Sequence, residues 1–486
     1  MKVLLVSPNR EHLPDPVFPL GLAYVAAAVR KHGHAVKVLD LCFSDDIDRD
    51  IKVSVTGFLP EVIGMSLRNI DDVAYPKKHS YITEYGKVME IVKKYTHAPV
   101  VLGGSGFTIM PEHFMKELHA DYGIAGEGEK AFPELIERIS LRKIVEDTPF
   151  VMPACPASFL EERFPTSLPT GQAGGNDDLE IFSCRNNISS FIYSSRTKIK
   201  DIDDITPYRE IFDSESYYRL GGMLNIQTKR GCPFRCIYCT YPKIEGRTVR
   251  MRDPLSVADE IEDIIEKTGV RHFFIVDSIF NYPVSHAKAV CDKIINRRLN
   301  IKWSCYANPA HMTEGLAGTM AKAGCTGIEF GTDSMSDEGL SVMGKNFTFE
   351  KIKKASVICR KHGIKFCHFI FIGSPGEDIE TTKRNLSRLE ETDPDAAVIM
   401  AGIRIFPGTR LAEIAREDLG ISGIGLRPVF YISKKISKKI DSIAELVSGK
   451  RNWVMPGYEI NIYPRLQKRL RERGIRGSLW EELAKR

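Results

Sequence analysis

The stretch Gly231-Cys232-Pro233-Phe234-Arg235-Cys236-Ile237-Tyr238-Cys239-Thr240 decides how the rest of the chain is understood. It follows an apolar run, residues 223–228, that predicts a strand. The cysteines are spaced C-x-x-x-C-x-x-C, so one loop can present three thiolates together. Thiolates are soft ligands that select iron–sulfur clusters, zinc or copper(I). We predict that Cys232, Cys236 and Cys239 hold three corners of a cubane iron–sulfur cluster and leave its fourth iron open to a small molecule.

Zinc is the alternative metal for this loop. A structural zinc site needs four closed ligands, and no fourth Cys or His follows at a zinc-like spacing. Idle core cysteines are a further alternative, which the fixed spacing disfavours. No second cysteine cluster is present, so an auxiliary iron–sulfur site is not expected. Other cysteines lie in apolar patterns and are expected to pack as small hydrophobes: Cys291, Cys305, Cys325, Cys359 and Cys367.

With this spacing behind a strand, the chain resembles the radical S-adenosylmethionine (radical SAM) superfamily. In that family the open iron of a [4Fe–4S] cluster binds the amino and carboxylate groups of SAM. The reduced cluster then cleaves SAM to a 5′-deoxyadenosyl radical. The resemblance implies that Cys232, Cys236 and Cys239 are the catalytic and metal-binding cysteines, and that Tyr238 lies beside the adenine of SAM.

Length and composition limit the other possibilities. A chain of 486 residues is too long for one hydrophobic core, so two or three domains are expected. With 68 Lys and Arg against 63 Asp and Glu, the chain lacks the basic character of nucleic-acid-binding proteins. The 11 cysteines do not suggest paired disulfides, which favours a cytoplasmic location. Neither a signal peptide nor a transmembrane segment of roughly 20 apolar residues is expected.

Residues 1–140 alternate predicted strands and helices. This alternation predicts an α/β domain with a doubly wound, Rossmann-like parallel sheet. Ligands of such sheets bind at the carboxyl ends of the strands. The strands are expected at residues 2–6, 35–41, 62–66, 99–102 and 121–125, and helices at 19–31, 84–95 and 129–139.

Four short segments resemble, in their order along the chain, the cobalamin-binding domain that precedes many radical SAM barrels. They are Pro19-Leu20-Gly21-Leu22, Ile63-Gly64-Met65-Ser66, Leu102-Gly103-Gly104 and Gly126-Glu127-Gly128-Glu129. A dinucleotide fold is disfavoured, because the turn after the first strand is long and rich in proline instead of carrying G-x-G-x-x-G. A flavodoxin-like regulatory domain without a ligand is the alternative. The resemblance implies that cobalamin is bound by Pro19, Gly21, Ser66, Gly103, Gly104, Ser105, Gly126, Glu127 and Gly128.

The histidines suggest how cobalt is bound. Cobalamin proteins with a histidine on cobalt carry D-x-H-x-x-G, and this chain has no such run. His32 and His34 follow a predicted helix and are expected to cap it. We therefore expect cobalamin with a displaced nucleotide tail and no protein histidine under the cobalt.

Residues 141–222 are expected to be a linker with a disordered insert. The polar, glycine-rich run at residues 167–178 has no periodicity and too little apolar surface to fix a fold. Residues 201–208 loosely resemble the D-x-I-P-x-P linker that precedes the barrel in the family, although Thr206 stands where the first proline would be.

Residues 223–410 alternate strands and helices again, and predict a partial (β/α)6 TIM-like barrel with its active site at the carboxyl ends of the strands. Its six strands are expected at residues 223–228, 272–276, 301–304, 327–331, 366–371 and 397–405. The family resemblance implies roles for residues expected at these ends. Asp277 would bind the SAM amino group, Glu329 would bind the ribose, and the turn with Gly373 and Pro375 would lie beside the adenine. A helix cap or a salt bridge is the alternative role for Asp277 and for Glu329.

Residues 411–486 are expected to form a small helical region. Residues 463–473 form a basic helix with Leu466 and Leu470 on one side, a stripe that usually docks on the parent domain. Binding to a membrane surface is the alternative. Residues 429–431 and Trp453 are candidates to close the substrate end of the barrel.

These features predict a cobalamin-dependent radical SAM enzyme. The resemblance implies methylation of an unactivated carbon of a small-molecule or lipid-like substrate, through a 5′-deoxyadenosyl radical and methylcobalamin. It also implies a flavodoxin- or ferredoxin-type electron donor. One alternative is a cobalamin-binding radical SAM enzyme that catalyses rearrangement, cyclisation or carbon–carbon coupling. Another is a catalytically inactive cobalamin sensor. The sequence does not predict the oligomeric state.

Overall fold

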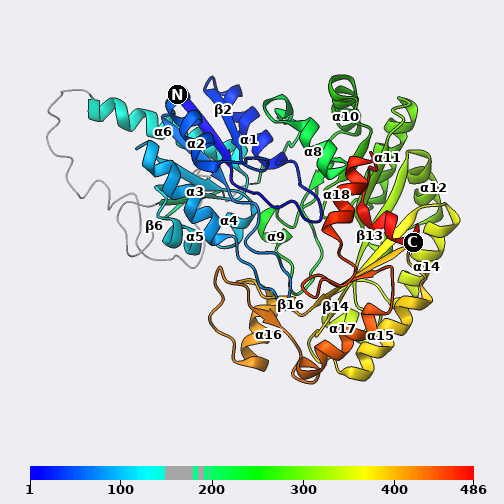
Figure 1. The fold of residues 1–486 in the computed structure, drawn as a ribbon. Coiled ribbons are helices and arrows are strands. Elements are labelled where there is room, and N and C mark those ends of the chain that lie inside the picture. Colours follow the sequence, from blue (N-terminus) through cyan, green and yellow to red (C-terminus); the bar gives the residue numbers. More distant parts are fainter. Residues whose placement is uncertain (148–178, 184–190, 196–197, 486) are drawn as a thin grey trace, which may run out of the picture.

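Two α/β domains lie side by side, and the carboxyl terminus lies on the second one (Figure 1). The computed structural model describes residues 1–147, 179–183, 191–195 and 198–485. The insert expected at residues 167–178 lies outside the described residues. Helix α18, red in Figure 1, contacts α8 of the segment that connects the two domains.

The first domain contains a seven-stranded sheet that is parallel except for its last strand. Across the sheet the strands are β2 (Ala35–Asp40), β1 (Lys2–Ser7), β3 (Val62–Ser66), β4 (Val100–Gly103), β5 (Tyr122–Ala125), β7 (Phe191–Ser195) and β6 (Leu179–Ser183). The helices are α1 (Leu20–Lys31), α2 (Ile47–Phe58), α3 (Ile82–Tyr95), α4 (Ser105–Ile109), α5 (Pro111–Leu118) and α6 (Gly128–Asp147).

The apolar run of β1 explains why the sheet is covered on both faces. Val3 and Leu5 pack in one core with residues of α1 and α6, whereas Leu4 and Val6 pack in a second core with residues of α2, α3 and α5. Successive side chains of a strand point to opposite faces, so an uninterrupted apolar run needs helices on both sides. This arrangement confirms the doubly wound sheet predicted from the sequence.

Two strands lie where a linker was expected. β7 pairs in parallel with β5, and β6 pairs antiparallel with β7. The first sheet therefore extends beyond residue 140, into the range 141–222. Both strands are short apolar runs separated from β5 by a long stretch of chain, so periodicity alone did not assign them to this sheet. The remainder of that range contains the 3-10 helix η1 (Arg209–Ile211) and α8 (Ser214–Gly221).

The second domain is a partial barrel. Its parallel strands are, in order across the sheet, β18 (Trp453–Val454), β15 (Ala396–Ala401), β14 (Lys365–Ile372), β13 (Cys325–Asp333), β12 (Lys302–Ala307), β11 (His272–Ile275) and β8 (Leu224–Ile226). The six strands from β8 to β15 are the six that the sequence predicted. Two small hairpins pair β9 (Lys229–Arg230) with β10 (Arg250–Met251), and β16 (Ile403–Arg404) with β17 (Phe430–Tyr431).

Helices follow most of the barrel strands. They are α9 (Tyr241–Ile244), α10 (Pro254–Thr268), α11 (Val284–Asn296), α12 (Glu314–Lys322), α13 (Asp337–Val342), α14 (Phe349–Lys361) and α15 (Ile379–Glu391). The predicted strand at residues 397–405 is broken at Gly402, which has a positive φ of 68°. That break directs the chain out of the barrel sheet and into the β16 hairpin.

The carboxyl-terminal region is more mixed than the expected helical tail. It contains α16 (Arg410–Leu419), α17 (Ile440–Ser448), α18 (Pro464–Glu472) and the 3-10 helices η3 (Ser437–Lys439) and η4 (Leu479–Lys485), but also the strands β17 and β18. β18 pairs with β15 and so extends the barrel sheet. Among the described residues, no helix is both long enough and apolar enough to cross a membrane.

Candidate cofactor and active site

The cysteine loop leaves the barrel after β9 and is held in a narrow turn. Gly231 has a φ of +96°, and a Cβ at this position would lie 2.1 Å from the carbonyl oxygen of Thr248, so only glycine fits. The Gly231 amide donates to the Glu245 carboxylate at 3.0 Å, and the Cys232 amide donates to the carbonyl of Gly246 at 3.0 Å. The loop is therefore held by backbone contacts, which leaves its thiols available for ligands.

The three cysteines of the loop lie near one another and are the candidates to hold a cluster. Cys232, Cys236 and Cys239 are unpaired and close enough to influence one another electrostatically. Burial raises the pKa of each thiol, and for Cys239 to about 12. Yet within the described residues no three Cys, His, Asp or Glu side chains are arranged around one metal ion. A zinc site would place its sulfurs about 2.3 Å from one point, whereas a cubane spreads three thiolates over three irons.

A buried lysine lies beside the cysteine loop. Lys345 pairs with Asp333 at 2.6 Å and donates to the carbonyl of Gly331 at 2.9 Å. Its pKa is raised, because the charges of Asp333, Cys236 and Cys239 outweigh the opposing effect of burial. The Tyr238 ring contacts Phe371 edge to face, with 5.0 Å between centroids. Tyr238 is therefore next to the ligand cysteines, as predicted, and its contact with adenine stays a prediction.

The carboxylate of Asp277 is engaged by neighbouring residues of the barrel. Its side chain is fully buried, and its two carboxylate oxygens accept from the amide and hydroxyl of Thr228 and from the amide and ammonium of Lys229, the last at 2.9 Å. A carboxylate with four donors has little capacity left for the SAM amino group. Asp277 instead fixes the chain that leads into the cysteine loop. The pair with Lys229 favours the salt-bridge alternative, and a contact of Asp277 with SAM stays a prediction.

Glu329 also differs from its prediction. The strand was expected to end at residue 331, but β13 continues to Asp333. Glu329 therefore lies inside the barrel, four residues before the strand end, and not at the active-site rim. Its Oε1 accepts from Trp480 Nε1 at 2.8 Å. Asp333 stands at the rim instead, with a φ of +65° that L-residues rarely adopt and that is typical of functional sites.

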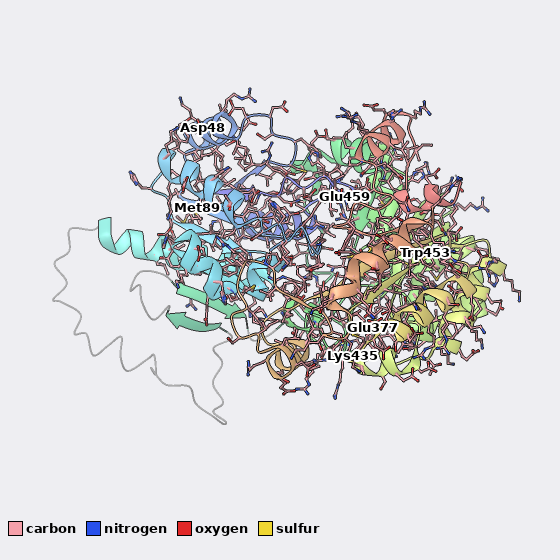
Figure 2. The ribbon with its side chains drawn as sticks, turned by 60° about the horizontal axis from the view of Figure 1, so that its bottom comes forward. Asp48, Met89, Glu377, Lys435, Trp453 and Glu459 are labelled. Carbon is pink, nitrogen blue, oxygen red and sulfur yellow. The ribbon has the colours of Figure 1, made fainter. Side chains whose placement is uncertain are left out.

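The Gly373–Pro375 turn follows β14 at the carboxyl end of the barrel. The amides of Gly373 and Ser374 donate to Glu377 at 2.8 and 2.9 Å. Lys435 donates to the carbonyl of Gly376 at 3.3 Å, and Figure 2 shows its side chain close to Glu377. The turn is therefore rigid and lies at the strand end where the adenine was predicted, which stays a prediction.

One cavity of about 1560 Å³ joins the first domain to the barrel interior. It is lined by all nine residues predicted to bind cobalamin: Pro19, Gly21, Ser66, Gly103, Gly104, Ser105, Gly126, Glu127 and Gly128. Of the residues predicted to bind SAM, only Glu329 lines it. At its mouth, Lys77 of the first domain pairs with Glu459 at 2.8 Å, and Figure 2 places Glu459 where the two domains meet. The cavity thus has room for a large planar cofactor at the carboxyl ends of the first sheet.

The turn after β4 provides a close backbone approach. Gly104 has a φ of +98°, and a Cβ there would lie 2.6 Å from the carbonyl oxygen of Leu67. The Ser105 hydroxyl donates to the carbonyl of Arg68 at 2.9 Å, so Ser105 shapes the loop after β3. The described part of the chain offers the guanidinium of Arg68 no ion-pair partner, and Arg68 lines the cavity. Arg68 was not predicted from the sequence, because it lies just past the recognised Ser66.

Glu127 joins the two domains. Its carboxylate accepts two hydrogen bonds from Arg250, at 2.6 and 2.9 Å, and one from the amide of Ile199. Arg230 lies 3.5 Å away and also pairs with Glu129 at 2.7 Å. Burial acts to raise the pKa of Glu127, but the two arginines outweigh it and the pKa is lowered. The Glu127 carboxylate is thus used for docking, and only its backbone remains for cobalamin.

The histidines named in the sequence analysis are not in the cavity. His32 Nδ1 lies 2.9 Å from the carbonyl of Ala28 at the end of α1, and His34 Nδ1 lies 3.3 Å from the amino terminus. The capping role of His32 is confirmed. The one histidine among the described residues that line the cavity is His79, half exposed at its mouth and 3.2 Å from Glu84. That no protein histidine binds the cobalt stays a prediction.

Two tyrosines missed in the sequence face the inside of the cavity. Tyr241 is 36% exposed and Tyr306 is 38% exposed, although both lie deep in the molecule. Burial raises the pKa of both hydroxyls, and the neighbouring charges include Glu329 for Tyr306 and Cys239 for Tyr241. These tyrosines therefore line the space between the cysteine loop and the barrel interior. Lone tyrosines in strand or turn patterns carry no sequence signal for such a role.

Family models match both domains. The radical SAM superfamily matches residues 226–389, which include the three cysteines. The B12 binding domain matches residues 7–136, which include the nine cavity residues of the first domain.

Curated relatives span most of the chain. A tryptophan 2-C-methyltransferase of Streptomyces laurentii is 26% identical over 86% of this chain and 74% of its own length. An anaerobic magnesium-protoporphyrin IX monomethyl ester cyclase of Rubrivivax gelatinosus is 24% identical over 82% of this chain and 67% of its own.

One solved structure has a similar fold over nearly the whole length of both chains. The radical SAM methyltransferase TsrM of Kitasatospora setae, with cobalamin and a [4Fe–4S] cluster bound, superposes with a TM-score of 0.79 at 25% identity, covering 100% of this chain and 97% of that one. Both domains, their order and the cysteine loop are thus accounted for together. The chain belongs to the cobalamin-binding radical SAM enzymes, the cofactors of which are a [4Fe–4S] cluster, SAM and cobalamin.

Proposed function

We propose that this enzyme transfers a methyl group from SAM to an unactivated carbon of a small, largely apolar molecule. The single observation that carries the proposal is the cavity that runs from the cobalamin-side turns of the first sheet into the barrel interior. A methyl donor on one side and a radical source on the other could act on one substrate only if they share such a space. The relative that methylates C2 of tryptophan supports the same reaction class.

The cofactors supply the chemistry that side chains lack: the cluster and SAM provide a radical that removes hydrogen from carbon, and cobalamin provides the methyl group. The chain's own residues hold and separate these groups. The turn at Gly104 lets backbone approach the corrin, and the thiols of the cysteine loop hold the cluster. Tyr241 and Tyr306 line the space between them and help to keep it free of bulk water.

The electron donor and the location of the enzyme belong to the same proposal. A flavodoxin- or ferredoxin-type protein is the expected electron donor to the cluster. All nine cysteines of the described residues are unpaired, which supports a reducing, cytoplasmic location.

The test uses SAM with an isotopically labelled methyl group. Reconstituted holoenzyme is incubated anaerobically with a reductant, labelled SAM and a small-molecule and lipid extract of the producing cells. We expect 5′-deoxyadenosine, S-adenosylhomocysteine and one extract component that gains the labelled methyl group. The Cys239→Ser variant should form neither 5′-deoxyadenosine nor labelled product.

Two results would contradict methyl transfer. The cyclase among the relatives makes rearrangement or cyclisation the specific alternative reaction. Formation of 5′-deoxyadenosine together with a changed but unlabelled substrate would support that alternative. Formation of neither product in any extract, with a full complement of cofactors bound, would support an inactive sensor.

A further inference from the structure

A carboxyl group in the barrel interior has no cationic partner in the described part of the chain. Glu329 lies in the middle of β13, and its Oε1 accepts from Trp480 Nε1 at 2.8 Å. Within the described residues it makes no other hydrogen bond and no ion pair. Glu329 is only 7% exposed, and it lines the cavity. Its second carboxylate oxygen, Oε2, is therefore accessible from the cavity. An ionised carboxylate that is buried without a counter-charge is unfavourable unless a ligand supplies that charge.

The segment that carries Trp480 closes the amino-terminal end of the barrel. Glu481 accepts from the hydroxyl of Ser304 at 3.0 Å, and Lys365 donates to the Glu481 carbonyl at 2.6 Å. A Cβ at Gly327 would lie 2.7 Å from Glu481, so glycine makes room for this segment. Trp480 and Glu329 together therefore form the floor of the cavity, opposite the cofactors.

The groups around Glu329 favour a positively charged ligand. Burial raises its pKa to about 7, the Trp480 hydrogen bond opposes this, and the neighbouring charges, Glu481 and Asp15, are both carboxyls. Tyr306 from β12 and Cys367 from β14 are the other titratable neighbours. No lysine or arginine is among these neighbours, so an ionised Glu329 has no counter-charge among the residues that the structure describes.

The walls above the floor are apolar. The residues that line this part of the cavity include Phe274, Tyr306, Phe369, Val398 and Met400. Such walls bind a hydrophobic or aromatic body and exclude water, which strengthens the attraction of opposite charges. An acid beside such apolar walls selects for both the apolar body and the polar end of a ligand.

We propose that the substrate is an apolar molecule with a basic amine, and that Glu329 binds this ammonium group on the barrel floor. The proposal rests on the proposed function, since it names the substrate of the same cavity. With the amine at the floor, the apolar body of the substrate extends upward between Tyr306 and the cofactor turns, where a carbon can be methylated. Glu329 is thus a specificity-determining residue, and Trp480 positions it.

The test compares two probes of the same shape, 2-phenylethylamine and 2-phenylethanol, by equilibrium dialysis against reconstituted holoenzyme. We expect the amine to bind at least about tenfold more tightly than the alcohol, a difference of about 1.4 kcal/mol, because only the amine forms a desolvated charge pair. Glu329→Gln, which can still accept from Trp480, should remove this preference. Glu481→Gln, a buried acid of the same segment outside the cavity lining, should retain it.

The pH dependence provides a second readout. Because Glu329 ionises near pH 7, amine affinity should rise between pH 6 and pH 8 in the wild type, while the amine itself stays protonated. Glu329→Gln should show no such rise. Trp480→Phe, which frees Glu329 from its hydrogen bond, should keep the preference for the amine.

Three results would overturn the proposal. The wild type binding both probes equally would do so, and so would Glu329→Gln retaining the preference for the amine. If Glu329→Gln weakened SAM binding and left the probes unaffected, Glu329 would belong to the SAM site. These dialysis results do not depend on turnover. A preference for the amine without any labelled product would therefore contradict methyl transfer and leave the amine site standing.

Discussion

Asp277 and Glu329 are two buried acids of one barrel with opposite surroundings. Asp277 accepts four hydrogen bonds, one from the Lys229 ammonium, and is fully buried. Glu329 accepts one hydrogen bond, from an uncharged indole, and faces a cavity. Their partners decide their roles, because a satisfied carboxylate is structural, whereas one without a counter-charge is available to a ligand.

Removal of the Asp277 carboxylate should therefore destabilise the fold. In Asp277→Ala the Lys229 ammonium stays buried without its counter-charge, and loss of one partner of a buried pair costs roughly 3–5 kcal/mol. Urea unfolding should show this loss, while Asp263→Ala on the exposed side of α10 should change stability by less than about 1 kcal/mol. If the Asp277→Ala protein had wild-type stability but no longer bound SAM, this result would support the predicted contact between Asp277 and SAM.

Residue identities were predicted better than residue roles. The cysteines were predicted as cluster ligands because their spacing on one loop is itself the chemical signal, and this role stays a prediction. The role of Asp277 was not predictable, since its partners, Thr228 and Lys229, lie about fifty positions earlier, and only the parallel pairing of β11 with β8 brings them together. Arg68 and Tyr306 were missed for a similar reason, because only the closed cavity gives them a common function.

At the scale of elements, the loop after α13 supports the cysteine loop. The Ile237 amide donates to the carbonyl of Met343 at 3.2 Å, and Lys345 lies beside the thiols. Gly344 lies between them with a φ of +72°, and a Cβ there would be 2.4 Å from the carbonyl oxygen of Arg235. The two loops can approach this closely only if residue 344 has no side chain.

Gly344→Ala should therefore lower the iron content of the reconstituted protein. The new methyl group forces the loop away from Arg235 and moves Lys345 from the ligand cysteines. Gly363→Ala is the matched control, since Gly363 also has a positive φ, of +67°, but nothing lies within 4 Å of its added Cβ. Both variants carry left-handed strain of about 1–2 kcal/mol, so iron per protein is the measurement that separates them. Equal iron content in the two variants would show that the loop contact is dispensable.

Helices and strands with a clear hydrophobic periodicity were predicted from the sequence, and those without such a periodicity were not. The six barrel strands and the five strands before residue 140 were found from apolar runs separated by helices. β18 has only two residues and β6 is antiparallel, so neither gives a strand–helix alternation. The end of β13 was placed two residues early because Thr332 and Asp333 are polar, although both are buried.

At the scale of the whole molecule, buried ion pairs hold the two domains around the shared cavity. Arg250 pairs with Glu127 at 2.6 Å on one side. On another, Arg404 pairs with Asp71 at 2.7 Å, and both side chains are almost completely buried. The order of the two domains was predictable from their motifs, but these pairs were not. They join residues 123 and 333 positions apart, and nothing in either local sequence marks them.

Arg404→Ala tests whether this docking shapes the cobalamin site. The substitution leaves the Asp71 carboxylate buried and unpaired in the loop after β3, which also carries Arg68. We expect a loss of roughly 3–5 kcal/mol in the free energy of unfolding and weaker retention of cobalamin on gel filtration. Arg410→Ala removes an exposed arginine that pairs with Glu413 at 2.6 Å, and should cost less than about 1 kcal/mol.

The stability of the Arg404→Ala protein should also depend on pH. Burial raises the pKa of Asp71, and Arg404 opposes this effect in the wild type. Without Arg404, the protein should regain stability as the pH falls and Asp71 is protonated. An Arg404→Ala protein that binds cobalamin like the wild type at every pH would show that the first domain forms its site without the barrel.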